Sequence, residues 1–300
     1  AVGCAGVRGQ VRVAVIICSV GRPDALAALV PWLDRQTKPP SEVVIVVTKD
    51  DDLPDATHLK ASIPIKTSFS AKGASTQRNT GLQEVQGRSD AVFFMDDDYL
   101  PAKTAIRGVE RAFEEYTDVT GLTGRLLADG IGKGGIQIED AIKMIEDYEA
   151  GLTSDEPTFE IIKDNVVGLY GCNMVCRSSA IGETRFDERL PLYSWQEDVD
   201  FTARLPGRLL KTDAFVGVHC GTQRGRDTRG KLLGYSQIAN PVYLVKKGSM
   251  PLGFAVKLMG RNLAANHLRL FKPEPRIDRR GRAKGNWLAI LDCLRGRERP

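Results

Sequence analysis

The sequence contains no run of apolar residues close to the roughly 18 that a helix needs to cross a bilayer. Residues 1–10 also lack the apolar core of a secretory signal peptide. We therefore expect a cytoplasmic protein, either soluble or peripheral at the inner face of the plasma membrane. Hydrophobic residues make up 42% of the 300 residues, which is enough for a sizeable core.

Cysteine is also scarce. Six cysteines are scattered over the chain instead of being dense in a short one, so a disulfide scaffold is not expected. Three residues separate Cys172 from Cys176, whereas the usual zinc hook has two between its cysteines. This pair is therefore not expected to bind zinc together with Cys220, and reduced thiols fit the pattern best.

Positive charge is concentrated near the C-terminus. The net charge is +4, but residues 245–300 carry 14 Lys or Arg against 4 Asp or Glu, a balance of +10 that leaves −6 for residues 1–244. Apolar residues lie near the end of this segment: Trp287, Leu288, Ile290, Leu291 and Leu294. The segment could lie on an anionic membrane surface, or it could form an amphipathic helix that packs on its own domain. Nucleic acid is not an expected partner, because interleaved stacking aromatics are missing.

Apolar patterning predicts an alternation of strands and helices in the first half of the chain. Residues 11–18 and 42–48 are almost continuously apolar, as buried parallel strands are, and residues 24–35 between them have helical spacing. Further helices are predicted at 74–85 and 104–116, on either side of a strand that starts near residue 91. This order predicts an α/β fold with a mostly parallel sheet flanked by helices.

The second half is less regular. Residues 129–140 are rich in glycine and are predicted to form a loop or a weak hairpin. Gly168 and Gly171 interrupt an apolar stretch, which favours a close approach of the backbone to a ligand. Helices are then predicted at about 234–247, 252–270 and 287–294. We therefore expect one domain with a helical extension at its C-terminal end, divided as residues 11–225 and 226–300.

An acidic triplet marks the most informative position. Five apolar residues end at Asp96, Asp97 and Asp98, which places three carboxylates at the carboxyl end of a buried strand, where open α/β sheets bind ligands. Three like charges are costly there unless a cation or strong donors neutralise them. Asp96 and Asp98 point to the same side of an extended chain, and their oxygens suit Mg²⁺ or Mn²⁺. The alternative is a solvated acidic turn.

Several other motifs accompany the triplet in a fixed order. They are Ser19-Val20-Gly21-Arg22-Pro23 after the first strand, Gln77-Arg78-Asn79-Thr80-Gly81-Leu82, Gly171-Cys172-Asn173-Met174 and Trp195-Gln196-Glu197-Asp198. The series resembles the family 2 glycosyltransferases of GT-A fold over about residues 11–220. Gly285-Asn286-Trp287-Leu288 also resembles a segment of bacterial polysaccharide and cell-surface glycan glycosyltransferases.

The resemblance implies a metal site at the triplet. Asp98 would ligate the Mn²⁺ or Mg²⁺ that bridges the donor diphosphate, while Asp96 would face the ribose or the metal and its water shell. His219 would complete the site, and imidazole is a suitable ligand for such a cation. A lone histidine next to an apolar run has a purely structural role as its alternative.

The resemblance also implies that the second acidic pair is catalytic. Asp198 would take the proton from the acceptor hydroxyl, and Glu197 would hold the acceptor or a neighbouring group. The structural alternative is a capping box, in which Ser194 caps a helix that starts near Trp195 and has Glu197 at its third position.

The remaining implied contacts concern the two substrates. The donor-binding candidates are Ser19, Arg22, Asp50, Lys72, Arg78, Asp96, Asp97 and Arg224. Asp50 would bind the nucleotide base, with Asp51 or Asp52 as alternatives, and Arg224 with Arg226 would close over the diphosphate. The acceptor-binding candidates are Gly171, Asn173 and Trp195.

Together these features predict an inverting, metal-dependent glycosyltransferase. It would move a hexose from a nucleoside diphosphate sugar, with UDP favoured, to a lipid-linked or polysaccharide acceptor. One alternative is a sugar nucleotidyltransferase, but that class needs a glycine-rich N-terminal loop and residues 19–23 contain one glycine. The other alternative is a non-catalytic binding module of the same fold.

Overall fold

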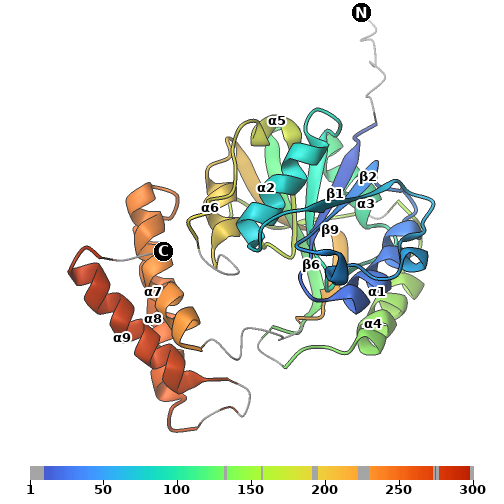
Figure 1. Ribbon diagram of the computed structural model, residues 1–300. Coiled ribbons are helices and arrows are strands. Elements are labelled where there is room, and N and C mark those ends of the chain that lie inside the picture. The colour runs from blue at the N-terminus through green and yellow to red at the C-terminus, as the bar shows by residue number, and fades with distance from the viewer. Residues whose placement is uncertain are drawn as a thin grey trace, which may run out of the picture.

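The protein is described here by a computed structural model. It describes residues 10–131, 134–156, 158–190, 195–221, 230–272, 274 and 277–297. Within these ranges the chain forms a nine-stranded mixed sheet covered by helices, followed by a group of helices at the C-terminal end (Figure 1).

The first part of the sheet is parallel. Its strands lie in the order β3, β2, β1, β4, with bounds Ile65–Phe69, Glu42–Val47, Val13–Cys18 and Ala91–Asp96. The connecting helices are α1 (Pro23–Asp34) and α2 (Ala74–Val85), and α3 (Ala105–Glu115) follows the acidic triplet. Every strand and helix predicted for this half of the chain is present, because continuous apolar runs and helical spacing were both unbroken.

The second part of the sheet mixes directions. It consists of β5 (Tyr99–Pro101), β6 (Val119–Asp129), β7 (Ile161–Lys163), β8 (Asn173–Arg177) and β9 (Arg208–His219). Strand β8 runs antiparallel to β4 and β6, whereas β6 and β9 are parallel. The short strands β5 and β7 pair with β9 in the antiparallel direction. The predicted fold class, a mixed sheet flanked by helices, is confirmed.

Two layers of helices cover the sheet. On one face α1, α3 and α4 (Ile138–Ala150) bury apolar side chains against β1, for example Val15 and Ile17. On the other face α2, α5 (Ser178–Ile181) and α6 (Glu197–Ala203) pack on the alternate side chains, for example Ile16. Two 3₁₀ turns, Asp50–Asp52 and Ala56–Leu59, lie between β2 and β3. The helices therefore cover the two faces of the sheet, and β1 and β4 end at the same edge, with Cys18 opposite Asp96.

Two helices differ from the sequence prediction. The loop predicted within residues 129–140 is present in the described residues between β6, which ends at Asp129, and α4, which begins at Ile138. The helix α4 was missed although Ala141 and Ile145 have helical spacing and are buried. The last helix begins at Arg279 instead of Trp287, because the Asp278 carboxylate caps it by accepting a hydrogen bond of 2.7 Å from the Gly281 N–H.

The C-terminal helices form the predicted extension. They are α7 (Gly230–Lys247), α8 (Leu252–Leu268) and α9 (Arg279–Leu294). Helices α7 and α9 approach closely, since a Cβ on Gly234 would lie 2.0 Å from the Arg282 carbonyl oxygen. Among the described residues, none of these or the other helices has both the length and the apolar character that a bilayer span requires. The predicted boundary at 225 lies in residues 222–229, outside the described residues, so the division stays a prediction.

A buried ionic contact joins this extension to α6. The Lys247 ammonium lies 2.7 Å from the Asp187 carboxylate and 2.8 Å from that of Asp200, which is completely buried in α6. The Ser249 hydroxyl donates to the other Asp200 oxygen at 2.6 Å. In addition, the Asn240 amide donates to the Trp195 carbonyl at 2.8 Å, just before α6 begins. Helix α6 is therefore held from two sides.

We predict that Lys247→Met destabilises the protein by about 1.5–3 kcal/mol, because it removes one of the two cations, Lys247 and Arg204, that pair with the buried Asp200 carboxylate. Urea unfolding followed by circular dichroism measures the free energy of unfolding. Lys143→Met is the matched control, because the Lys143–Asp147 ion pair on α4 is exposed and contributes about 0.5 kcal/mol or less. Equal effects of the two substitutions would show that the buried contact does not hold α6.

Candidate active site

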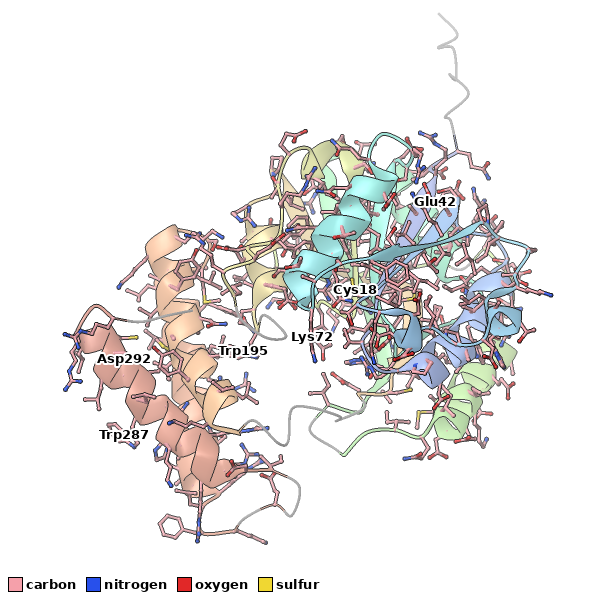
Figure 2. The ribbon with its side chains drawn as sticks, in the orientation of Figure 1. Cys18, Glu42, Lys72, Trp195, Trp287 and Asp292 are labelled. Carbon is pink, nitrogen blue, oxygen red and sulfur yellow. The ribbon has the colours of Figure 1, made fainter. Side chains whose placement is uncertain are left out.

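The candidate residues gather where the parallel strands end. Figure 2 shows Cys18, the last residue of β1, on the same side of the sheet domain as Lys72 and Trp195, whereas Glu42 at the start of β2 lies at the opposite edge. The acidic triplet follows β4 at the same edge as Cys18, since β1 and β4 are parallel with Cys18 opposite Asp96. Two further sets of candidate residues reach this edge. Arg78 lies on α2, which connects β3 to β4, and Glu197 with Asp198 begins α6, which lies between β8 and β9.

Asp97 is the most buried member of the triplet. It accepts a hydrogen bond of 2.6 Å from the Ser19 hydroxyl and pairs with the Arg22 guanidinium. Burial raises the pKa of Asp97 to about 7, against the attraction of Arg22. Arg22 also lies 3.0 Å from an Asp98 oxygen. The loop after β1 therefore provides donors and positive charge to two of the three carboxylates.

Asp96, Asp98 and His219 form a group with metal-ligand geometry. One ligand atom from each lies within 4.8 Å of the others. The His219 Nε2 atom is 3.3 Å from an Asp98 oxygen and 3.7 Å from an Asp96 oxygen. His219 reaches this point because it ends β9, whose neighbour β5 directly follows the triplet. The structure thus brings together the three residues that the sequence suggested as metal ligands.

Asp129 orients the imidazole and was missed by the sequence analysis. Its carboxylate lies 3.1 Å from His219 Nδ1, so that Nε2 faces the two acids of the triplet. The Tyr170 hydroxyl donates to the other Asp129 oxygen at 2.9 Å and fixes this carboxylate in turn. A carboxylate behind a histidine in this way is the usual support of a metal-bound imidazole. The donor set therefore fits a hard divalent cation.

The electrostatics of this group also favour a cation. Burial opposes the charged form of His219, yet the hydrogen bonds to Asp129 and Asp98 raise its pKa above the usual range. In the opposite sense, the hydrogen bonds from His219, the Ile131 N–H and Tyr170 lower the pKa of Asp129 although burial opposes its charge. Arg22 and Arg78 also face the triplet, but each is shared by two carboxylates, so negative charge remains that a divalent ion would neutralise.

Arg78 connects the two acidic motifs. It is 6% exposed, and its guanidinium pairs with Glu197, lies 3.3 Å from an Asp96 oxygen and donates to the Gly171 carbonyl at 3.1 Å. These partners raise its pKa even though burial works against the charge. In the structure its guanidinium is thus bound by protein groups of both acidic motifs. The contact of Arg78 with the donor stays a prediction.

The second acidic motif begins a helix, as predicted, but not with the predicted cap. Helix α6 starts at Glu197 with Gln196 before it in a left-handed conformation (φ 76°) and without a side-chain cap. The capping box with Ser194 is therefore wrong: the helix starts too late for Glu197 to occupy its third position. Ser194 itself lies outside the described residues.

Asp198 is held by the backbone of residue 171. One of its oxygens accepts a hydrogen bond of 2.9 Å from the Gly171 N–H, and burial raises the pKa of this carboxyl above its ordinary value. Burial likewise raises the pKa of Glu197 to about 8, against the attraction of Arg78. Gly171, expected to contact the acceptor, thus contacts Asp198 itself.

The nucleotide-base candidates differ in exposure. Asp50 and Asp51 are exposed, whereas Asp52 is completely buried. Asp52 accepts hydrogen bonds from the Gly21 N–H at 2.7 Å and the Thr48 N–H at 2.9 Å, which joins the loops after β1 and β2. Asp52 is therefore occupied by the backbone, and Asp50 remains open to a ligand.

The other candidates are scattered around the edge. Lys72 is exposed before α2, and Trp195 is partly exposed before α6. The Asn173 side chain is completely buried and accepts a hydrogen bond of 2.7 Å from Thr123, so the structure does not place it where an acceptor could bind. Arg224 and Arg226 lie outside the described residues.

The comparisons with known proteins agree with this arrangement. The family model "Glycosyl transferase family 2" matches residues 14–183, more than half of the chain. A search of the curated proteins found no significant match.

Solved structures of low sequence identity share the fold. The structure of residues 1–349 of S. aureus TarS has a TM-score of 0.54 at 12% identity, and its complex with UDP-GlcNAc has 0.56 at 14%. Both matches cover 94% of this chain and 81% of that one. A structure of GalNAc-T7 with UDP, GalNAc and Mn²⁺ has a TM-score of 0.50 at 11% identity, covering 86% of this chain and 58% of that one.

We predict that Gly171→Ala costs about 1–3 kcal/mol of stability, because the new Cβ would lie 3.1 Å from an Asp198 oxygen and 3.2 Å from Arg78 Nη2. Thermal unfolding measures this change. Gly260→Ala on α8 is the control: a Cβ there meets no atom within 4 Å, and alanine favours the helix by up to about 1 kcal/mol. A neutral or stabilising Gly171→Ala would mean that the contact between Gly171 and Asp198 is not tight.

Proposed function

This chain belongs to glycosyl transferase family 2, and we propose that it transfers a hexose from a nucleoside diphosphate sugar to an acceptor hydroxyl with inversion at the anomeric carbon. That it is a glycosyltransferase follows from the family; the donor, acceptor and stereochemistry are the proposal. UDP is the favoured nucleotide, and the TarS and GalNAc-T7 complexes with UDP-GlcNAc and UDP support this choice. The observation that carries the proposal is the pair of acidic motifs at one edge of the sheet.

We propose that Asp96, Asp98 and His219 hold Mn²⁺ or Mg²⁺. The support is their mutual distance of 4.8 Å or less, the orientation of His219 by Asp129 and the excess of carboxylates over cations. When bound, such an ion offsets the negative charge that develops on the leaving nucleoside diphosphate. Mn²⁺ in the GalNAc-T7 structure is consistent with this choice.

The donor would occupy the carboxyl edge of the parallel strands. Asp97 orders the loop after β1 through Ser19 and Arg22, and the Arg22 guanidinium is partly exposed, within reach of a phosphate. Lys72 would add a second positive charge from the segment before α2. Asp50, which is exposed after β2, would contact the nucleotide base, as the resemblance implies. Arg224 keeps its predicted role in closing over the diphosphate.

Asp198 is proposed as the general base. Its burial raises its pKa, which makes the carboxylate a better proton acceptor than an exposed one. The Gly171 N–H donates to one of its oxygens at 2.9 Å, and the Val199 N–H at the start of α6 donates to the other at 2.8 Å. Glu197 is engaged by Arg78, so we propose that this pair places Asp198 relative to the triplet, with Trp195 beside them as the acceptor contact.

The acceptor is proposed to be a polysaccharide or a lipid-linked glycan at the inner face of the plasma membrane. The support is the basic C-terminal segment, whose balance of +10 suits an anionic surface or anionic acceptor groups. The family assignment gives no support to a nucleotidyltransferase or a non-catalytic module, the two alternatives that the sequence left open.

We predict that Asp198→Asn lowers turnover by about 10²–10⁴-fold while UDP still binds, because only proton removal is lost. By contrast, Asp98→Ala should weaken Mn²⁺-dependent UDP binding by about tenfold or more, because a proposed ligand is removed. Donor hydrolysis or transfer measures the first effect, and calorimetry the second.

Asp140→Ala serves as the control for both, since this carboxylate is exposed on α4 and is not one of the candidate site residues. Full turnover in Asp198→Asn would rule out the base assignment, and unchanged binding in Asp98→Ala would rule out the metal assignment.

We also predict that Asp129→Asn weakens Mn²⁺ binding by about 10–100-fold although Asp129 is not a proposed ligand. The reason is that the asparagine no longer fixes the His219 tautomer as the carboxylate does. The electron paramagnetic resonance signal of free Mn²⁺ reports this affinity independently of activity. Asp147→Asn, an exposed change on α4, should leave the affinity unchanged. An unchanged affinity in Asp129→Asn would show that His219 is not oriented for metal binding.

A further inference from the structure

The outer face of α9 exposes large apolar side chains. Trp287 is 57% exposed, Leu288 39%, Leu291 45% and Leu294 81%. Successive members of this set are one, three and three positions apart in the sequence, which places them in one stripe along the helix. Figure 1 shows α9 along the outer edge of the helical extension, and Figure 2 shows Trp287 on its outer side.

This stripe is not the face that packs on the protein. The side of α9 that faces α7 buries Ala283, Asn286 and Ala289 instead. The Asn286 amide donates to the Gly234 carbonyl at 2.6 Å, and its oxygen accepts from Asn266 at 2.9 Å. Helix α9 therefore has small and polar residues inside and its largest apolar residues outside, the reverse of a helix that only covers a core.

Positive charges stand at both ends of the stripe. Arg280 and Lys284 precede it on the same face, and Arg295 with Arg297 follow it. These four side chains are exposed, and none has an ion-pair partner among the described residues. Together Arg280, Lys284, Trp287, Leu288, Leu291, Leu294 and Arg295 make up what we call the α9 outer face.

The acidic side chains described for this region form contacts away from the stripe. Glu274 pairs with Arg269 and Arg279, and Asp292 accepts a hydrogen bond of 3.0 Å from the Tyr235 hydroxyl. Asp278 caps α9 itself. Among the residues that the structure describes, therefore, no carboxylate lies in the α9 outer face to balance its cations.

The apolar surface continues onto the end of α8. The Trp287 ring contacts the His267 ring edge-on, with 6.0 Å between the centroids. The next residue, Leu268, is 69% exposed, and Phe271 just beyond α8 is 91% exposed. The exposed patch is thus wider than one helix.

We propose that the α9 outer face docks on an anionic phospholipid bilayer, with α9 lying in the plane of the interface. Its apolar centre would enter the boundary of headgroups and acyl chains, and the flanking Lys and Arg would contact lipid phosphates. Charge complementarity favours this occupant over symmetric pairing with a second copy, which would oppose the same cations on both chains. The inference rests on the proposed function, since it places the enzyme where a lipid-linked acceptor is found.

The test is co-sedimentation of the full chain with vesicles of phosphatidylcholine alone or with phosphatidylglycerol. We expect binding to the anionic vesicles that weakens with salt. Leu291→Glu should weaken it by about tenfold or more, because it places a carboxylate in the apolar centre. Arg280→Gln with Lys284→Gln should weaken it by about fivefold for each charge, from about 1 kcal/mol per cation near the surface.

Met144→Glu is the matched control, because Met144 is a helical residue of similar exposure (38%) on α4. It should bind vesicles as the unmodified protein does, and circular dichroism checks that each variant is folded. Absence of binding to anionic vesicles, or equal binding by Leu291→Glu, would overturn the proposal. A lipid-free dimer that Leu291→Glu dissociates would overturn it in favour of a second copy.

Mn²⁺-dependent UDP binding is measured on the same samples without lipid. It should be the same in Leu291→Glu and in the unmodified protein, since the substitution lies outside the candidate active site. If vesicles bind while UDP does not, the proposed function fails and the membrane surface stands. If UDP binds while vesicles do not, only the membrane surface fails.

Discussion

The concentration of carboxylates at one edge of the sheet is the constraint on which the rest of this structure depends. Asp97, Asp98 and Glu197 are each less than a tenth exposed, and buried like charges are costly unless they are compensated. The compensation comes from separate elements: Arg22 after β1, Arg78 on α2 and the donors around them. The connections after β1 and after β3 thus each bring one arginine to this edge. A divalent ion would supply the positive charge that these arginines do not.

This constraint gives the C-terminal helices a role in positioning the second acidic motif. The acids of the second motif begin α6, and α6 is short, so its position depends on what packs against it. Asp200 lies in the middle of that helix. Its carboxylate accepts hydrogen bonds from Lys247, at the end of α7, and from Ser249, just beyond α7. The extension therefore fixes the proposed base, Asp198, from behind, while the opposite surface on α9 is free to meet a partner.

The sequence predicts the first half of the fold well, because β1, β2 and β4 are covered on both faces and so read as continuous apolar runs. The proposed metal ligands could also be predicted, since Asp96 and Asp98 belong to one short motif and the resemblance pointed to His219. Asp129 could not be predicted, because it lies 90 residues from His219 and nothing in the local sequence marks the end of β6 as functional. The burial of Asp52 and Asn173 likewise depends on tertiary contacts that no local pattern reveals.

The most direct test of the metal and nucleotide site is calorimetric titration of the full chain with UDP in Mn²⁺, in Mg²⁺ and in chelator, with ADP and GDP for comparison. A cation held by Asp96, Asp98 and His219 predicts that UDP binds in the presence of metal, that chelator abolishes the binding, and that the other nucleotides bind more weakly. Equal UDP binding with and without chelator, or no nucleotide binding under any condition, would contradict it.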